Sequence, residues 1–160
     1  MKKVISGGQT GVDRAGLDAA LSVGIAIGGW CPKGRKAEDG VIPDRYPLTE
    51  TATANYPERT RRNIAESDAT LIFSCGLTLS GGTALTYRLC QEIGKPHRVI
   101  DLDDFPRIEQ RAVILLDALD WLVENKVQTL NVAGPRESGN PGIGEEVRNF
   151  LEELFSDWIW

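Results

Sequence analysis

The sequence contains few of the residues that build metal sites and covalent cross-links. Its 160 residues include three cysteines and one histidine. The cysteines, Cys31, Cys75 and Cys90, are odd in number and widely spaced, which argues against a disulfide framework, and His97 alone cannot complete a zinc set. We therefore expect no metal site, and free thiols in a reducing cytoplasm. Cys75 and Cys90 are expected to pack in the interior, whereas Cys31, in a loop, is the candidate for a reactive thiol.

Long apolar runs and an excess of positive charge are missing as well. No stretch approaches the roughly 18 apolar residues that cross a bilayer, and the first residues lack the apolar core of a signal peptide. The net charge of −5 disfavours a broad nucleic-acid surface. However, residues 1–62 carry a net charge of +3 and the remainder −8. This asymmetry favours a local site for a small anion, although an unevenly charged solvated surface would give the same pattern.

Glycine, by contrast, is abundant, with 17 of 160 residues against a usual fraction of about 7%. The glycines punctuate an alternation of apolar segments and helical patterns. Strands are predicted at residues 3–6, 25–30, 69–74, 98–102 and 128–133, and helices at 13–23, 57–67, 83–93, 106–125 and 143–158. Short, continuously apolar strands are typical of a parallel sheet covered on both faces. We predict one α/β domain over residues 1–160, a three-layer α/β/α Rossmann-like fold with a five-stranded parallel sheet in the order 3-2-1-4-5.

Three glycine-rich loops are expected where strands of this sheet end and helices begin, at residues 7–11, 79–83 and 133–138. Free backbone N–H groups and the helix dipole make such a place attractive to an anion, although tight turns alone would also account for the glycines. The first loop lacks the Gly-x-Gly-x-x-Gly pattern, and the Walker Lys-Ser/Thr pair is missing too. An ordinary dehydrogenase and a P-loop NTPase are therefore disfavoured.

Polar side chains near these loops complete the candidate site. Asp13 and Arg14 begin the first helix, where Asp13 could instead act as a cap. Arg59, Thr60 and Asn63 share a helix face, which could equally be a solvated one. The long loop 31–55 is expected to be functional or disordered. No catalytic residue is assigned; the predicted ligand-binding residues are Gly7, Gly8, Gln9, Thr10, Gly11, Asp13, Arg14, Lys33, Arg35, Arg59, Thr60, Asn63, Ser80, Gly81, Gly82, Thr83, Gly134, Pro135 and Arg136.

Several stretches of the chain resemble the molybdenum cofactor carrier protein family. They are residues 7–18, 29–40, 46–51, 59–63, 67–72, 80–83 and 131–136, so the resemblance covers nearly the whole chain. It implies a Rossmann-like domain, a homo-oligomer (tetramer or dimer), and a pocket for the molybdenum cofactor, a pterin with a terminal phosphate. Glycine-loop amides and arginines suit such a ligand. The implied partners are apo molybdoenzymes, with no nucleic acid and no membrane.

Residues 80–86 also resemble a loop of the Lonely Guy phosphoribohydrolases, once labelled lysine decarboxylase-like. That loop reads Pro-Gly-Gly-x-Gly-Thr-x-x-Glu; here it is shorter by one glycine, and Thr86 stands at the position of the glutamate. A hydroxyl cannot replace a carboxylate in acid catalysis. Hydrolase activity is therefore disfavoured unless Asp13, Glu38 or Asp39 supplies the missing acid. We therefore predict a carrier rather than an enzyme. The alternatives are a nucleotide-binding phosphoribohydrolase-like enzyme and a sensor of a nucleotide ligand.

The last predicted helix ends in apolar aromatic side chains. Trp158 and Trp160 have little chain after them to cover their rings. We therefore expect them to contribute to a contact between subunits.

Overall fold

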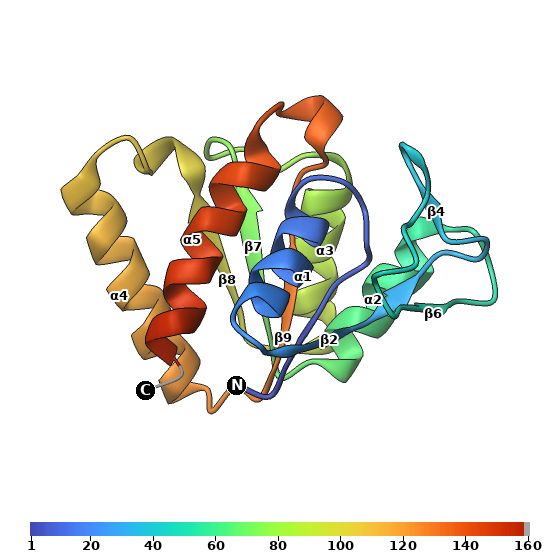
Figure 1. Ribbon diagram of the computed structural model, residues 1–160, viewed down its shortest axis with the longest axis horizontal. Helices are drawn as coiled ribbons and strands as arrows, with labels where there is room; N and C mark the ends of the chain where they lie inside the picture. The colour runs from blue at the N-terminus through green and yellow to red at the C-terminus, as the bar shows by residue number, and fades with distance from the viewer. Residues whose placement is uncertain (159–160) are drawn as a thin grey trace.

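Five parallel strands form a sheet between two layers of helices in the computed structural model, which describes residues 1–158 (Figure 1). The strands are β1 (Lys3–Ile5), β2 (Ala26–Gly28), β7 (Ala69–Ser74), β8 (His97–Asp101) and β9 (Thr129–Ala133). The helices are α1 (Val12–Ser22), α2 (Tyr56–Glu66), α3 (Gly81–Ile93), α4 (Ile108–Glu124) and α5 (Ile143–Trp158). Helices α1, α4 and α5 pack together on one face, and α2 and α3 on the other. The predicted three-layer fold is confirmed.

The strand order corrects the prediction of 3-2-1-4-5. The observed order is β2-β1-β9-β7-β8, which is 2-1-5-3-4 when these five strands are numbered along the chain. Counting β9 as the first strand restores 3-2-1-4-5, so the sheet is a circular permutation of the Rossmann order. The hydrophobic pattern did not reveal this because every inner strand of a covered sheet is apolar, wherever it occurs in the sequence.

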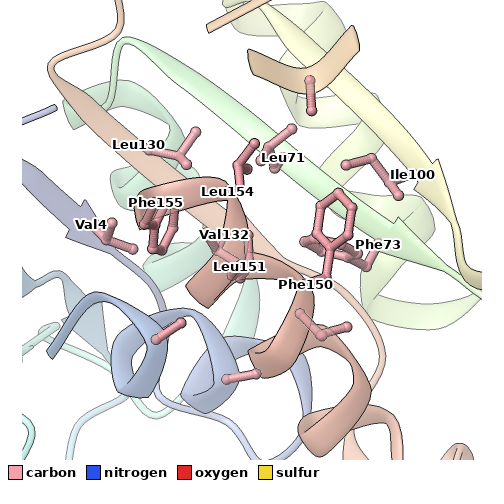
Figure 2. Close-up of a cluster of buried hydrophobic side chains, with 14 of the residues drawn as sticks. Val4, Leu71, Phe73, Ile100, Leu130, Val132, Phe150, Leu151, Leu154 and Phe155 are labelled. Atoms are coloured by element: carbon pink, nitrogen blue, oxygen red, sulfur yellow. The ribbon is translucent and has the colours of Figure 1, made fainter. Parts of the chain in front are cut away.

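Apolar side chains fill the space on both sides of the sheet, which explains why all six residues of β7 are buried. The larger cluster joins the sheet to α1, α4 and α5 (Figure 2). Its aromatic centre is Phe150, whose ring meets Phe73 edge-on at 5.9 Å and stacks on Phe105 at 4.9 Å. A smaller cluster under α2 and α3 contains Ile64, Ile72, Leu89 and Cys90.

The long segment 31–55 is folded. It contains the short strands β3 (Trp30–Cys31), β4 (Lys36–Ala37), β5 (Gly40–Val41) and β6 (Thr49–Glu50), which pair as β3-β6 and β4-β5. An apolar cluster anchors it to α1 through Leu17 and includes the fully buried Cys31 and Tyr46. The guanidinium of Arg35 donates to the carbonyls of Ile42, Pro43, Tyr46 and Leu48. This segment is therefore a small folded unit with its own core.

The expectation for one cysteine is wrong: Cys75 is exposed rather than packed in the interior, while Cys90 is buried as predicted. Cys31, the candidate for a reactive thiol, is buried. Trp158 is half-buried and packs on the larger core cluster. Trp160, expected at a subunit contact, lies outside the described residues. Through residue 158, no helix has both the length and the apolarity to cross a membrane.

Candidate functional site

A cleft of about 650 Å³ opens at the carboxyl ends of β1, β9 and β7. The helices that follow β9 and β7 lie on opposite faces of the sheet, α5 on one and α3 on the other. The cleft therefore lies at the topological switch point, where open α/β sheets bind ligands. Its volume falls in the range of about 300–1,000 Å³ that is usual for small-molecule sites.

Many of the predicted ligand-binding residues line this cleft, and they come from three loops and three helices. They are Gln9, Asp13, Arg59, Thr60, Ser80, Gly81, Gly82, Thr83, Gly134, Pro135 and Arg136. Sequence reasoning missed other lining residues, including Tyr56, Ser74, Cys75, Thr86 and Arg88. For Arg88 a signal was available, because Gly81, Leu85 and Arg88 have the i, i+4, i+7 spacing of one helix face.

The N-terminus of α3 is the open part of this cleft. Ser80 precedes the helix, and its side chain makes no capping hydrogen bond. A Cβ added to Gly81 or Gly82 would meet no atom within 4 Å. The backbone N–H groups of Gly81, Gly82 and Thr83 find no acceptor within the described residues. Unpaired N–H groups and the positive end of the helix dipole together favour an anion here.

The other two glycine loops are filled by the chain itself. At the start of α5, the carboxylate of Glu137 accepts from the N–H groups of Gly142 at 2.5 Å and Gly144 at 3.0 Å. In the β1 loop, a Cβ on Gly11 would lie 2.6 Å from the carbonyl oxygen of Pro135, so this loop packs directly on the β9 loop. Of the three predicted anion sites, α3 is therefore the one whose first three helical N–H groups all lack an acceptor among residues 1–158.

The cleft carries more positive than negative charge. Its lining contains Arg59, Arg88 and Arg136, and Asp13 is the one carboxylate among the lining residues. Arg59 Nη1 lies 3.5 Å from Asp13 Oδ2, with both side chains largely buried. The ring of Tyr56 lies within cation–π distance of Arg59, at 5.6 Å, and of Arg136, at 5.5 Å. This balance suits an anionic ligand.

Burial and neighbouring groups shift the pKa of Asp13 in opposite directions. Burial raises the pKa of its carboxyl above the ordinary value, while Arg59 and the backbone N–H of Gln9 act in the opposite direction. The N–H of Gln9 donates to Oδ2 at 3.1 Å. Gly7 makes room for the arginine, because a Cβ there would lie 2.3 Å from Arg59 Nη1. Gly7 thus leaves room for Arg59 and is not among the residues that line the cleft.

Three buried polar atoms of the cleft-lining residues have no hydrogen-bond partner among residues 1–158. They are Gln9 Nε2, Arg59 Nε and Ser74 Oγ. Leaving a buried polar group unpaired costs roughly 1–3 kcal/mol, and native proteins rarely do so without a functional reason. Their gathering around one cleft indicates a polar ligand or ordered water at this place.

Several predicted site residues have structural partners outside the cleft. Arg14 forms a bidentate pair with Asp39 at 2.6 and 2.7 Å and donates to the carbonyl of Gly8 at 3.0 Å. This pairing lowers the pKa of Asp39. Asn63 brackets the backbone of Trp30, accepting from its N–H at 2.8 Å and donating to its carbonyl at 2.9 Å.

The remaining predicted residues outside the lining belong to the folded segment 31–55 or to its contacts. The guanidinium of Arg35 donates to backbone carbonyls within segment 31–55. Lys33 is exposed, and its backbone N–H donates to the carbonyl of Thr53. Gly8 lies under Ile42 and Leu48. Thr10 donates its hydroxyl hydrogen to Glu38 and accepts from the N–H of Glu137 at 3.2 Å.

Glu38 joins three parts of the chain beside the cleft. Besides Thr10, it accepts from the N–H of Ser138 at 3.1 Å and from its hydroxyl at 2.5 Å. Its Oε2 also lies 3.8 Å from Arg136 Nη1. The segment 31–55 thus contributes no lining residue to the cleft and instead ties the β1 loop to the β9 loop.

The hydrolase-like loop has no acid at its expected place. The hydroxyl of Thr86 donates to the carbonyl of Gly82 at 2.9 Å, as a helical threonine commonly does. Within residues 1–158, no three side chains of His, Cys, Asp or Glu converge to hold a metal ion.

Comparison with known proteins identifies the family. The structure resembles the crystal structure of the "putative molybdenum carrier protein" from Syntrophus aciditrophicus, with a TM-score of 0.85 and 43% sequence identity over 97% of this chain and 94% of that one. A second solved structure, (E)-4-hydroxy-3-methyl-but-2-enyl diphosphate reductase, aligns over 94% of this chain and 59% of that one, with a TM-score of 0.39 and 15% identity, too distant for any argument. No curated protein matches. A family model matches residues 4–155, and the chain therefore belongs to the circularly permutated YpsA SLOG family.

Proposed function

We propose that the cleft holds the molybdenum cofactor, with the terminal phosphate of its pterin at the N-terminus of α3, and that the chain acts as a carrier of this cofactor. The observation that carries the proposal is the open α3 N-terminus, with three free N–H groups, in a cleft that also contains three arginines. The name of the 43% identical protein from Syntrophus aciditrophicus is consistent with this function.

The residues present fit a phosphate ester. The amides of Gly81, Gly82 and Thr83 supply donors that a phosphate oxygen can approach closely, because neither glycine carries a Cβ. Arg88 lies on the same helix, and its side chain forms no ion pair or hydrogen bond within residues 1–158, so its planar guanidinium is available for bidentate binding. Tyr56 adds a flat ring on which a heterocycle can stack.

Binding and release, rather than bond cleavage, are what these groups can perform. The molybdenum chemistry belongs to the cargo, while this chain's residues neutralise the phosphate, orient the ring and exclude water from it. From the resemblance to the carrier family, we extend the proposal to a cytoplasmic homo-oligomer that delivers the cofactor to apo molybdoenzymes.

The test compares two arginines on neighbouring helices. Arg88→Gln removes a cation from the cleft, and Arg61→Gln removes one from an exposed pair with Glu92. Both variants change the net charge equally. We expect Arg88→Gln to weaken retention of the cofactor roughly 10- to 100-fold, the factor that a charge-assisted hydrogen bond typically carries, and Arg61→Gln to leave it nearly unchanged.

Retention is measured by pterin fluorescence after gel filtration, and delivery by reconstitution of an apo molybdoenzyme. If the wild type neither retains nor delivers the cofactor, the proposal fails. Equal losses in the two variants would place the binding site outside the cleft.

A further inference from the structure

We propose that Gln9 and Asp13 read the edge of the ligand's heterocycle, and that the ligand class is a phosphate ester of a ring with adjacent carbonyl, N–H and amino groups, as in pterin and guanine. The inference rests on the proposed phosphate site and names the chemistry at the opposite wall of the same cleft. Both side chains lie nine-tenths or more within the protein, at 6% and 3% exposure, and both line the cleft.

The amide of Gln9 is a donor of fixed orientation. Its Oε1 accepts from the N–H of Thr10 at 3.1 Å and from the N–H of Glu38 at 2.9 Å. These two backbone donors require the oxygen at that position and so direct the NH₂ group the other way. Nε2 has no partner among the described residues. Gln9 therefore offers a hydrogen bond that a ligand carbonyl can accept.

Asp13 supplies an acceptor from the same turn of the chain. The hydrogen bond from Gln9 N–H to Asp13 Oδ2, at 3.1 Å, holds the two residues together in one turn. Arg59 approaches the same oxygen, and Oδ1 takes part in none of the hydrogen bonds within residues 1–158. A carboxylate is an acceptor with two oxygens, which can pair with an adjacent N–H and amino group.

Together the two side chains contribute one donor and a two-oxygen acceptor to the lining of the same cleft. The complementary ring edge carries a carbonyl, an N–H and an amino group in sequence, which is the edge shared by pterin and guanine. Hypoxanthine lacks the amino group, and adenine lacks both the carbonyl and the N–H. A site built to form such hydrogen bonds rejects a ring that leaves them unpaired. The unpartnered Ser74 Oγ at the end of β7 adds a further polar contact in the same cleft.

Titration calorimetry on the wild type tests the inference with four probes: guanosine, inosine and adenosine monophosphates, and inorganic phosphate. We expect the guanosine ester to bind roughly 10- to 100-fold more tightly than the inosine and adenosine esters, the factor expected for one charge-assisted hydrogen bond. Equal affinities for the guanosine and inosine esters, or a preference for the adenosine ester, would overturn it.

Two near-isosteric variants locate the preference. Asp13→Asn replaces one acceptor oxygen by a donor, and Gln9→Glu keeps the oxygen that Thr10 and Glu38 require but removes the free donor. We expect each to abolish the preference for guanosine. Asp117→Asn, on α4 and paired with Arg98 at an exposed site, is the control for net charge and should leave the preference intact. Circular dichroism shows whether each variant folds. If neither variant folds, the titrations of the wild type with the four probes test the inference by themselves.

The outcomes separate this inference from the proposed function. If phosphate binds and the guanosine ester binds no more tightly than phosphate, Gln9 and Asp13 do not recognise the ring, while the proposed phosphate site at α3 is retained. If neither phosphate, nor any nucleotide, nor the molybdenum cofactor binds, the proposed function fails and the inference fails with it.

Discussion

Helices α3 and α5 begin at the same edge of the sheet, each after a glycine-containing turn. They differ in whether the backbone N–H groups at the N-terminus have hydrogen-bond acceptors. At α5 the carboxylate of Glu137 accepts from two backbone N–H groups. At α3 the corresponding donors are free, and Ser80 makes no capping bond. A glycine loop before a helix therefore keeps free donors for an external anion only where the chain provides no anion of its own.

The reason for the difference can be seen in the residues before each helix. Glu137 lies within seven residues of both N–H groups that it binds. Between the end of β7 and the start of α3, residues 75–80 contain no acidic side chain. Both helices begin with N–H groups that have no intrahelical acceptor, and both have the same dipole. The local presence or absence of a carboxylate therefore decides which end can receive a ligand.

The largest effect is expected from making α3 resemble α5. Ser80→Asp places a carboxylate at the N-cap, where it can accept from the helix N–H groups. We expect it to weaken phosphate-ester binding roughly 100-fold or more, because two like charges a few ångströms apart repel by several kcal/mol at a partly buried site. Calorimetric titration with the molybdenum cofactor measures the change. Ser80→Asn caps without a charge and serves as the control; equal losses in both variants would contradict an electrostatic cause.

The converse change removes the cap from α5. Glu137→Ala leaves the N–H groups of Gly142 and Gly144 without their acceptor, and we expect a loss of about 1–2 kcal/mol in the free energy of unfolding. Ser80→Ala at α3 removes no hydrogen bond and should cost less than about 0.5 kcal/mol. Urea denaturation followed by circular dichroism compares the two. A larger loss for Ser80→Ala would mean that the assignment of capped and open ends is reversed.

The smallest effect concerns Glu38, which ties the β1 loop to the β9 loop beside the cleft. Hydrogen bonds from Ser138 and Thr10 lower the pKa of Glu38 below 4.5. Its contribution to stability is therefore fully present above pH 4.5 and is lost as the pH falls through the lower pKa of the folded state. We expect wild type to melt above Glu38→Gln at pH 7, and the difference to shrink progressively below pH 4.5. A difference that is constant with pH would exclude the charge as its source.

Much of the fold could be predicted because the local pattern is strong. The strand Ala69–Ser74 and the helix Ile143–Trp158 were predicted with the bounds that the structure shows. The order of the strands could not be predicted, because β9 is as apolar as any other inner strand and nothing local marks it as the centre of the sheet. The folded segment 31–55 was missed for a similar reason, since its strands of two residues leave no periodicity.

For the candidate site as well, features set by local sequence could be predicted, whereas features that depend on the fold could not. The glycine turns and Arg59 could be found from residue type and position. The partners of Arg14 and Asn63 could not, because Asp39 and the backbone of Trp30 lie 25 and 33 residues away in sequence. The carbonyls that Arg35 binds are only 7 to 13 residues away, but they converge on its guanidinium only once segment 31–55 is folded. Nor could Ser74 be identified as unpartnered, since that depends on which neighbours fail to reach it.

The sequence by itself determined the fold class and the places where glycine-containing turns follow strands of the sheet, because both follow from short-range hydrophobic spacing and backbone freedom. Only the tertiary structure decided which helix end is open, that β9 brings Gly134 and Arg136 between the loops of β1 and β7, and that Gln9 and Asp13 share one wall of the cleft. These are long-range matters, since whether a donor or a charge is free depends on every group that the fold places beside it.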